Sequence, residues 1–300
     1  MTLVSSPIAD APPCLDESTF AGTVEDLPLS TRFRLQAEIT PVQQAFLDLH
    51  GFIVFSQVAR PDEVRAILDD IQSVTDRLVA SGQRTIYGVP IWIGDDPDGA
   101  PLLQRMAFTT VMSEYLKAFV RDERFEPVRR VVGEDARIGD EEKDGAVFNT
   151  YINVEGGLRP NLAWHTDGLR DVFYHLKPAP PMFNIGLHFD RIRPDDGGLY
   201  VIPGTHEQSI WSTLFSKIHF VSQKPDPQEL HVETWPGDLT IHDGRMWHRV
   251  ATSTKTGWQS IRRSMYVPYV RDAYDPKSED SEPLLYHRLF DWIMKLRGAR

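Results

Sequence analysis

The sequence predicts a mainly β protein, with an antiparallel sandwich or barrel and helices packed outside it. Between Val147 and Val270, short β-rich runs alternate with turn signals, and no helical pattern separates them. The 22 prolines, distributed along the chain, favour short elements over long helical bundles. A chain of 300 residues can bury a large core, so we expect one elaborated domain over residues 36–300.

The segments before the β-rich region are predicted to form a leader, helices and one strand. Residues 1–35 lack periodicity and are rich in Pro, Ser, Asp and Thr, so we expect a loosely ordered leader. A helix is predicted over 40–50, where threonine precedes proline and glycine follows the last turn. An apolar run at 52–55 predicts a buried strand, and helical spacing returns over 61–78. Further helices are expected near residues 111–121, 125–132 and 283–296.

Within the β-rich region, turn residues separate runs that carry β-branched and aromatic side chains. The turn signals include Gly-Gly, Pro-Asp-Asp-Gly-Gly and Pro-Gly sequences. Residues 82–107 are mixed in character, and no element is assigned to them. The strands are predicted within residues 147–154, 182–189, 198–203, 231–242 and 264–270.

Charge and cysteine content argue against several classes of partner. The formal net charge of −11 disfavours nucleic acid and anionic membrane surfaces, since those partners reward clustered Lys and Arg. Cys14 is the only cysteine, so the chain cannot form an intrachain disulfide. The sequence shows neither a signal-peptide pattern nor an apolar run long enough to span a bilayer. We therefore expect a cytoplasmic protein whose partner is a small molecule.

The segment Trp164-His165-Thr166-Asp167 carries the strongest chemical signal. On an extended strand, residues i and i+2 point to the same face, so His165 and Asp167 can reach one point. Imidazole and carboxylate ligands suit a first-row metal, and a second histidine would complete the two-His-one-carboxylate set of iron(II) oxygenases. His-x-Asp pairs are common by chance, so this pair alone is weak evidence.

The third ligand is predicted in the segment 235–248. A Pro-Gly-Asp turn and a β run precede His248, which a rolled sheet would return to the first pair. His242 competes within this segment, and we interpret it as a partly exposed turn histidine. Downstream, Arg262 and Arg263 are adjacent on a strand, so only one of them can point into a barrel. An inward arginine requires an anion and suits a carboxylate, whereas surface positions for both remain the alternative.

In combination, these segments resemble the phytanoyl-CoA dioxygenase family of iron(II)- and 2-oxoglutarate-dependent oxygenases. The resemblance covers about residues 40–270, and its specificity lies in the order of the motifs. It implies a double-stranded β-helix core, that is, a cupin-like jelly roll. The matching segments are Trp164-His-Thr-Asp167, the strand Met182–Phe189, the turn from Asp196 to His206, the segment from Pro236-Gly-Asp to His248, and the downstream arginine.

The resemblance further implies which residues bind the cofactors. His165, Asp167 and His248 correspond to the iron ligands and form the catalytic centre. An arginine corresponds to the partner of the distal carboxylate of 2-oxoglutarate. Arg262 is favoured over Arg263, because Tyr269 then falls where the family's following strand has an aromatic residue; Arg263 stays open. The remaining candidates for contact with 2-oxoglutarate are Asn184 and, more weakly, Asn149 and Tyr151.

The implied reaction consumes O₂ and 2-oxoglutarate, releases succinate and CO₂, and removes a hydrogen atom from the substrate. Halogenating relatives have a small residue in place of Asp167, so hydroxylation is the predicted outcome, with desaturation, ring closure and epoxidation as alternatives. The loop 168–181 is predicted to form a pocket wall, or else a solvated loop. Its candidate substrate-binding residues are Arg170, Phe173, Tyr174 and His175. We expect a small organic acid, an amino-acid derivative or a secondary metabolite as substrate.

Two other classes of protein fit part of the pattern. A zinc-dependent hydrolase could use the same His, Asp and His ligands with a metal-bound water as nucleophile. It would need a general base nearby and no buried arginine, and the order of the motifs argues against it. A non-catalytic jelly-roll binding protein is the second alternative, although all three predicted ligands are present in the sequence.

Overall fold

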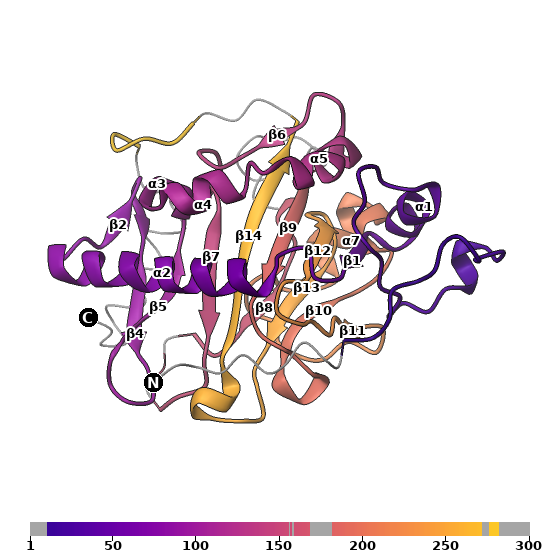
Figure 1. Cartoon of the computed structure of the whole chain (residues 1–300). Coiled ribbons are helices and arrows are strands. Elements are labelled where there is room, and N and C mark those ends of the chain that lie inside the picture. Colours follow the sequence, from indigo (N-terminus) through magenta and orange to yellow (C-terminus); the bar gives the residue numbers. More distant parts are fainter. Residues whose placement is uncertain (1–10, 156, 158, 169–181, 272–275, 282–300) are drawn as a thin grey trace.

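The computed structural model describes residues 11–155, 157, 159–168, 182–271 and 276–281 (Figure 1). Two antiparallel sheets form its centre. The larger sheet contains β1 (Phe52–Phe55), β4 (Trp92–Asp95), β5 (Pro101–Met106), β6 (Arg137–Ile138), β7 (Val147–Tyr151), β9 (Met182–His188), β12 (Leu239–Asp243) and β14 (Arg262–Val270). The smaller sheet contains β8 (Leu162–His165), β10 (Gly198–Val201), β11 (Leu230–His231) and β13 (His248–Ala251).

The strand order shows how the chain passes back and forth between the two sheets. The larger sheet runs β1-β12-β9-β14-β7-β5-β4, with β6 beside β14, and the smaller runs β11-β10-β13-β8. From β7 to β14 the chain alternates between the two sheets, with β10 and β11 as a consecutive pair in the smaller one, as in a double-stranded β-helix. The predicted fold class, mainly β with a jelly-roll core, is therefore confirmed.

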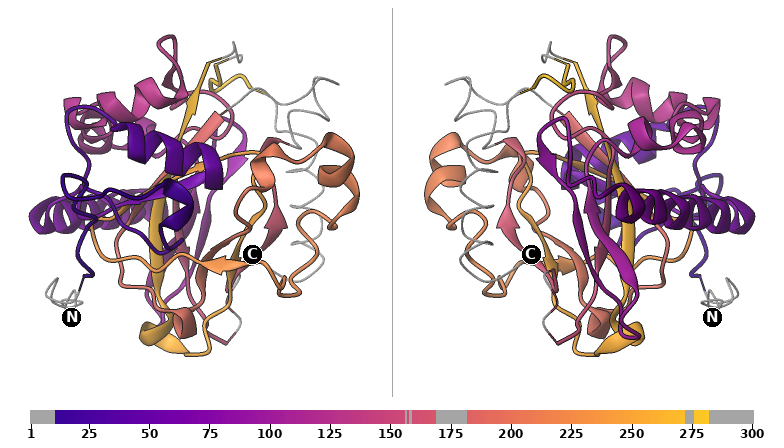
Figure 2. Two further views of the ribbon diagram at one scale, coloured as in Figure 1. Left: turned by 90° about the vertical axis from the view of Figure 1, so that its right-hand side faces the viewer. Right: turned by 90° about the vertical axis from the view of Figure 1, so that its left-hand side faces the viewer.

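Helices cover the outer face of the larger sheet, where α2 crosses the strands (Figures 1 and 2). Its N-cap residue precedes proline, and a left-handed glycine ends it, as the sequence predicts. The α-helices are α1 (Pro41–His50), α2 (Pro61–Ser81), α3 (Thr109–Met112), α4 (Glu114–Phe119), α5 (Glu126–Val132) and α7 (Ile210–Phe215). The 3₁₀-helices are η2 (Val24–Asp26), η3 (Glu123–Phe125), η4 (Pro194–Asp196), η5 (Thr205–Glu207) and η6 (Gly257–Ser260).

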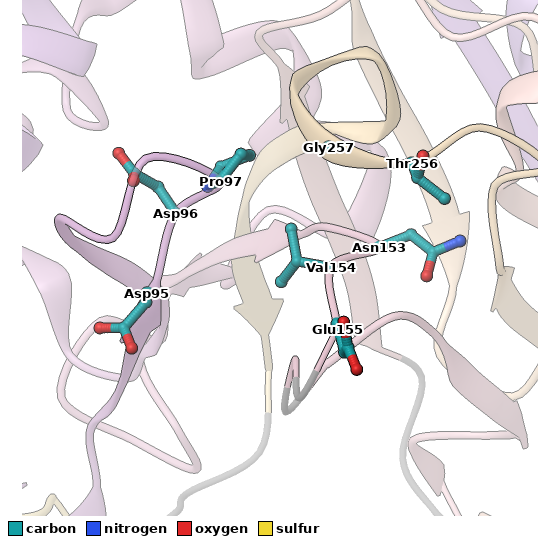
Figure 3. A pocket seen from close by; sticks show the side chains of 8 residues that line it. All are labelled: Asp95, Asp96, Pro97, Asn153, Val154, Glu155, Thr256 and Gly257. Carbon is teal, nitrogen blue, oxygen red and sulfur yellow. The ribbon is translucent and has the colours of Figure 1, made fainter.

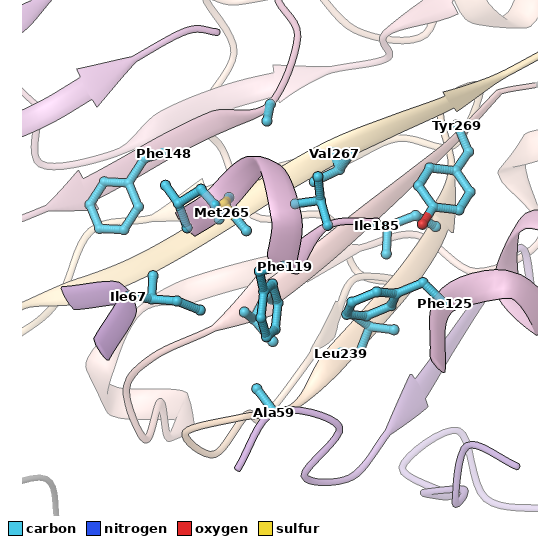
Figure 4. Close-up of a cluster of buried hydrophobic side chains, with 14 of the residues drawn as sticks. Ala59, Ile67, Phe119, Phe125, Phe148, Ile185, Leu239, Met265, Val267 and Tyr269 are labelled. Carbon is cyan, nitrogen blue, oxygen red and sulfur yellow. The ribbon is translucent and has the colours of Figure 1, made fainter. Parts of the chain in front are cut away.

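The period-2 alternation of β14 separates the apolar core from the interior of the barrel. Odd-numbered residues from Met265 to Tyr269 point towards the helices and are buried there. The side chains that they meet include Ile67, Phe119, Phe125 and Leu239 (Figure 4). Even-numbered residues, Arg262 and Tyr266 among them, point towards the smaller sheet, so the space between the sheets is polar.

Three segments differ from the expectations. The helix expected over 111–121 is divided, because Ser113 is extended and caps α4 with its hydroxyl. Residues 82–107, left unassigned, form β4, β5 and the hairpin of β2 (Thr85–Ile86) and β3 (Val89–Pro90). The end of the expected leader packs on the core, where Phe33 is fully buried and forms a bridge with Phe55. The helix expected at 283–296 lies outside the described residues. Over the residues that are described, none of the helices combines the length and apolar character needed to cross a bilayer.

Candidate active site

Two histidines meet where strands of the smaller sheet pair. His165 ends β8, His248 begins β13, and the register places them directly opposite each other. Their ring centroids are 4.1 Å apart. Asp167 lies two residues beyond His165, and its main-chain amide donates to the carbonyl of Gly244 at 2.7 Å. One ligand atom from each of the three side chains lies within 4.8 Å of the other two.

The tautomers of the two histidines suit metal binding. Nδ1 of His165 lies 2.9 Å from the carbonyl oxygen of Ala163, and Nδ1 of His248 lies 3.0 Å from that of Met246. A carbonyl oxygen only accepts, so each Nδ1 carries the proton and each Nε2 keeps its lone pair. Burial, reinforced by His248, lowers the pKa of His165 to about 3. The residues therefore fit a divalent metal with one carboxylate and two neutral imidazoles.

Asn184 holds the predicted carboxylate ligand. From β9, its Nδ2 donates to Oδ2 of Asp167 and lies 3.3 Å from Nε2 of His242. The side chain thus orients the carboxylate, a role that the sequence did not indicate. In metal sites, such outer contacts fix the ligands and tune their affinity.

The interpretation of His242 as a partly exposed turn residue is wrong. The side chain is 2% exposed and points into the barrel from β12, which β1 and β9 flank on both sides. Its ring centroid lies 4.6 Å from that of His248, and burial lowers its pKa well below the usual value. In the described part of the chain, Nδ1 of His242 has no hydrogen-bond partner.

The two adjacent arginines point to opposite sides of β14. Arg262 is buried between the sheets, and three of its five N–H groups donate to main-chain carbonyls, those of Pro160, Ala251 and Ser260. No acidic side chain of the described residues lies within 4 Å of it. Arg263 forms a bidentate ion pair with Asp190.

Tyr269, by which the resemblance favours Arg262, lies on the same strand as both arginines. Tyr269 lies an odd number of residues from Arg262, so the two side chains point to opposite faces of β14. The ring packs in the core beside Phe125 (Figure 4).

Asn149 and Tyr151 lie on the inner face of β7, and Tyr151 pairs with Arg262 in the register. Both contact a residue that the sequence analysis did not select. Nη1 of Arg159 donates to Oδ1 of Asn149 at 2.9 Å, and Nη2 donates to the hydroxyl of Tyr151 at 3.2 Å. No sequence signal distinguishes this loop arginine from a surface one.

Phe220 covers one side of the centre. Its ring stacks on that of His165, with centroids 4.9 Å apart, and its amide donates to the carbonyl of Trp164 at 2.8 Å. His219 lies beside it, with Nε2 3.3 Å from the hydroxyl of Thr166. The predicted substrate-binding residues Arg170, Phe173, Tyr174 and His175 lie outside the described residues.

The cavity shown in Figure 3 is separate from this centre. It measures about 520 Å³ and lies where the turn after β4 approaches the loop after β7. Acidic groups, including Asp95, Asp96 and Glu155, dominate the charge of its lining, and none of the three predicted ligands borders it.

A sequence model of the phytanoyl-CoA dioxygenase (PhyH) family matches residues 47–257, which is more than half of the chain. The chain belongs to this family. It is therefore a 2-oxoglutarate-dependent non-haem iron enzyme, and its cofactors are iron(II), 2-oxoglutarate and O₂. The prediction of this class is confirmed in place of the hydrolase and the binding protein. No curated protein sequence matches this PhyH-family chain.

Solved structures share the fold of this family member at low sequence identity. AviO1 from Streptomyces viridochromogenes Tue57 is 18% identical with a TM-score of 0.55, and the match covers 77% of this chain and 94% of that one. HygX from Streptomyces hygroscopicus, solved with nickel and 2-oxoglutarate, is 18% identical with a TM-score of 0.56, covering 77% and 87%. SnoN, a non-haem α-ketoglutarate-dependent epimerase from nogalamycin biosynthesis, is 15% identical with a TM-score of 0.57, covering 81% and 86%.

Proposed function

We propose that this enzyme hydroxylates an unactivated C–H bond of a small organic acid, an amino-acid derivative or a secondary metabolite, with release of succinate and CO₂. The observation that supports hydroxylation is the carboxylate of Asp167, which Asn184 holds beside the two imidazoles. In halogenating relatives a small residue stands here, and a halide takes the place of the carboxylate. We further propose a cytoplasmic location, which the single cysteine supports.

We assign the metal to His165, Asp167 and His248. When bound there, iron(II) would supply the redox chemistry that activates O₂ with 2-oxoglutarate. Main-chain carbonyls hold Nδ1 of both imidazoles, which turns each Nε2 to the metal, and Asn184 fixes the carboxylate. Phe220 shields His165 from water on one side, which protects a reactive centre from side reactions.

We assign the distal carboxylate of 2-oxoglutarate to Arg262. Its three main-chain contacts fix the guanidinium without neutralising it, and two N–H groups remain for a ligand. A planar guanidinium suits bidentate binding of a carboxylate. Arg263 is unsuited to this role, because its guanidinium already forms an ion pair with Asp190.

The first experiment is an anaerobic titration of the metal-free protein with iron(II) and then 2-oxoglutarate. A saturable visible charge-transfer band is expected, because the co-substrate chelates the metal. His165→Ala and Asp167→Ala should lose the band. His231→Gln should keep it, because that half-buried histidine lies on β11 outside the cluster. Iron binding without a band, or a band that survives both ligand substitutions, would refute the assignment.

Arg262→Gln and Arg263→Gln form a matched pair for the co-substrate site. The first should weaken 2-oxoglutarate binding at least about tenfold, since a charge-assisted hydrogen bond contributes roughly 1.5–3 kcal/mol. The second should leave this affinity unchanged. The reverse pattern would assign the co-substrate to Arg263.

The outcome of the reaction is read from the product. Hydroxylation adds one oxygen atom from O₂ to the substrate, whereas epimerisation leaves its mass unchanged and desaturation removes two hydrogens. Candidate acids are first screened for succinate release, and the product is then analysed by mass spectrometry under ¹⁸O₂. A product without the label would contradict hydroxylation.

A further inference from the structure

Arg159 is a second buried arginine between the sheets. It is 7% exposed, and its guanidinium lies 5.1 Å from the ring of Trp92 and 4.9 Å from that of Tyr151. Its hydrogen bonds go to two neutral oxygens, those of Asn149 and Tyr151. Throughout the described ranges, no carboxylate lies within ion-pair distance of Arg159.

A buried cation without an anion is costly, since transfer of a charge from water to the interior loses several kcal/mol even after relaxation. The nearest comparison on this part of the sheet is Arg105, opposite Asn149 on β5. That arginine has its own partner, Asp144, at 2.9 Å. Among the described residues, the neighbourhood of Arg159 therefore retains one uncompensated positive charge.

This charge lies in the same interior as the metal-binding residues. The ring of Tyr151 contacts Arg159 and also Arg262, whose guanidinium is 5.8 Å from it. Tyr266 lies four residues from Arg262 on the same face of β14, and its ring centroid is 5.7 Å from that of His242. His242 in turn contacts His248. Arg159 and the metal-binding residues thus face the same interior of the barrel.

The proposed metal, its ligands and the co-substrate do not balance the positive charge of Arg159. An iron(II) ion, the carboxylate of Asp167, dianionic 2-oxoglutarate and Arg262 together carry no net charge. Arg159 adds one positive charge that none of them balances. The substrate is the remaining component of the reaction, and an anionic substrate would balance this charge.

Gln104, on β5, is a fully buried polar side chain whose amide has no hydrogen-bond partner among the described residues. It packs against Gly94, where a Cβ would come within 2.4 Å of Nε2. Gly94 lies two residues from Trp92 on β4, and the pairing of β4 with β5 is irregular between Trp92 and Ile93, where Gln104 has no residue opposite it.

We propose that Arg159, together with Asn149 and Tyr151, binds a carboxylate of the substrate, so that the enzyme acts on an organic acid rather than on a neutral metabolite. This inference rests on the proposed function and assigns the substrate class within it. The fork of N–H groups fits a carboxylate, and the indole of Trp92 offers an apolar surface for the adjoining part of the molecule. Arg262 keeps its proposed role as the partner of 2-oxoglutarate.

The test uses protein loaded with nickel(II) and 2-oxoglutarate, which is inert to O₂ chemistry, and isothermal titration calorimetry. The probe is phenylacetate, with phenylacetamide as its neutral counterpart. Phenylacetate should bind. The affinity for phenylacetamide should be at least about tenfold lower, because a neutral amide accepts no charge-assisted hydrogen bond from the arginine. Arg159→Gln should lower the affinity for phenylacetate by a similar factor. Arg159→Lys should lower it by less, since lysine keeps the positive charge. Arg105→Gln, which alters an arginine that already has a partner, should leave the probe's affinity unchanged.

Each alternative outcome is distinct. A loss of 2-oxoglutarate affinity in Arg159→Gln, with the probe unaffected, would place Arg159 in the co-substrate site and overturn the inference. Equal binding of acid and amide, or no saturable binding of phenylacetate by the parent, would also overturn it. If the parent fails to bind 2-oxoglutarate before any probe is added, the proposed function itself fails. Arg159→Lys, which preserves the buried charge, covers the case in which Arg159→Gln does not fold.

Discussion

At the metal site, the position of Asp167 depends on the amide of Asn184. Asn184→Ala removes this hydrogen bond and leaves the three ligands in the chain. We expect iron(II) affinity to fall by about 10- to 100-fold, the usual effect of losing an outer contact to a ligand. The measurement is a metal titration without 2-oxoglutarate, which separates this effect from contact with the co-substrate. Asn161→Ala, at a partly exposed asparagine that precedes β8 and donates to the hydroxyl of Thr252, is the control. Unchanged affinity would show that the Gly244 contact alone fixes the turn.

His188 is a residue whose titration affects folding. Burial, together with the charge of Arg32, lowers its pKa to about 3. The unfolded value is about 6.5, so the unfolded chain binds the proton first. This histidine therefore contributes stability above pH 6.5 that is lost as the pH falls towards 3. Between pH 7 and pH 5 the loss is about 2 kcal/mol by linkage.

The measurement is urea unfolding of the metal-free protein at both pH values, for the parent and for His188→Gln. The variant should lose less stability between the two pH values, because glutamine does not titrate. Each protein is compared with itself at the two pH values, so the effect of the substitution on overall stability cancels. Identical pH dependence in both proteins would refute the assignment.

The sequence is sufficient to predict the relative position of residues whose arrangement depends on local geometry. His165 and Asp167 are two residues apart at the end of β8, so an extended backbone is enough to predict that they reach one point, although Asp167 itself lies in the turn after the strand. The burial of His242 depends on β1, which comes from a distant part of the chain and covers β12. Arg159 lies on a loop whose direction only the packed barrel determines. Neither residue could have been placed from its own neighbourhood.

At the scale of elements, two glycines end helices in the same left-handed conformation but in different surroundings. Gly51 ends α1 with φ of 77°, and a Cβ there would lie 2.4 Å from Nδ1 of the buried His206. Gly82 ends α2 with φ of 70°, and nothing lies within 4 Å of the corresponding Cβ. The pair therefore separates backbone strain from packing.

Gly82→Ala should cost about 1 kcal/mol, the strain of a left-handed residue. Gly51→Ala should cost about 2–3 kcal/mol, because it also displaces His206 from its contact with the carbonyl of Asp48. Urea unfolding measures both. Equal losses of stability in the two variants would mean that the side chain of His206 can move aside without a cost in free energy.

The elements that the sequence predicts well are those with local signals. The caps of α1 and α2 and the alternation of β14 depend on neighbouring residues alone. β4 and β5 contain proline, glycine and aspartate in place of the usual β-branched residues, so they resemble loops in isolation. They form strands because β7 offers them a sheet edge.

For the whole molecule, a buried ion pair attaches the N-terminal segment to the barrel. Arg32 and Asp238 are 206 positions apart, and both are almost fully buried. Arg32→Leu leaves the carboxylate without its partner and should cost about 3–5 kcal/mol. Arg271→Leu, at the exposed pair with Asp135, should cost less than about 1 kcal/mol. Both are measured by urea unfolding. A small loss at Arg32 would show that the segment detaches before the barrel unfolds.

The central position of β14 has a consequence for synthesis. This strand is among the last described elements of the chain, yet it lies between β9 and β7 and completes both pairings. A nascent chain that has emerged only as far as η6 has two open strand edges in the middle of its larger sheet. Such edges bind other chains readily. Until residue 270 has left the ribosome, the barrel cannot close, and a chaperone that shields these edges would have its main effect in that interval.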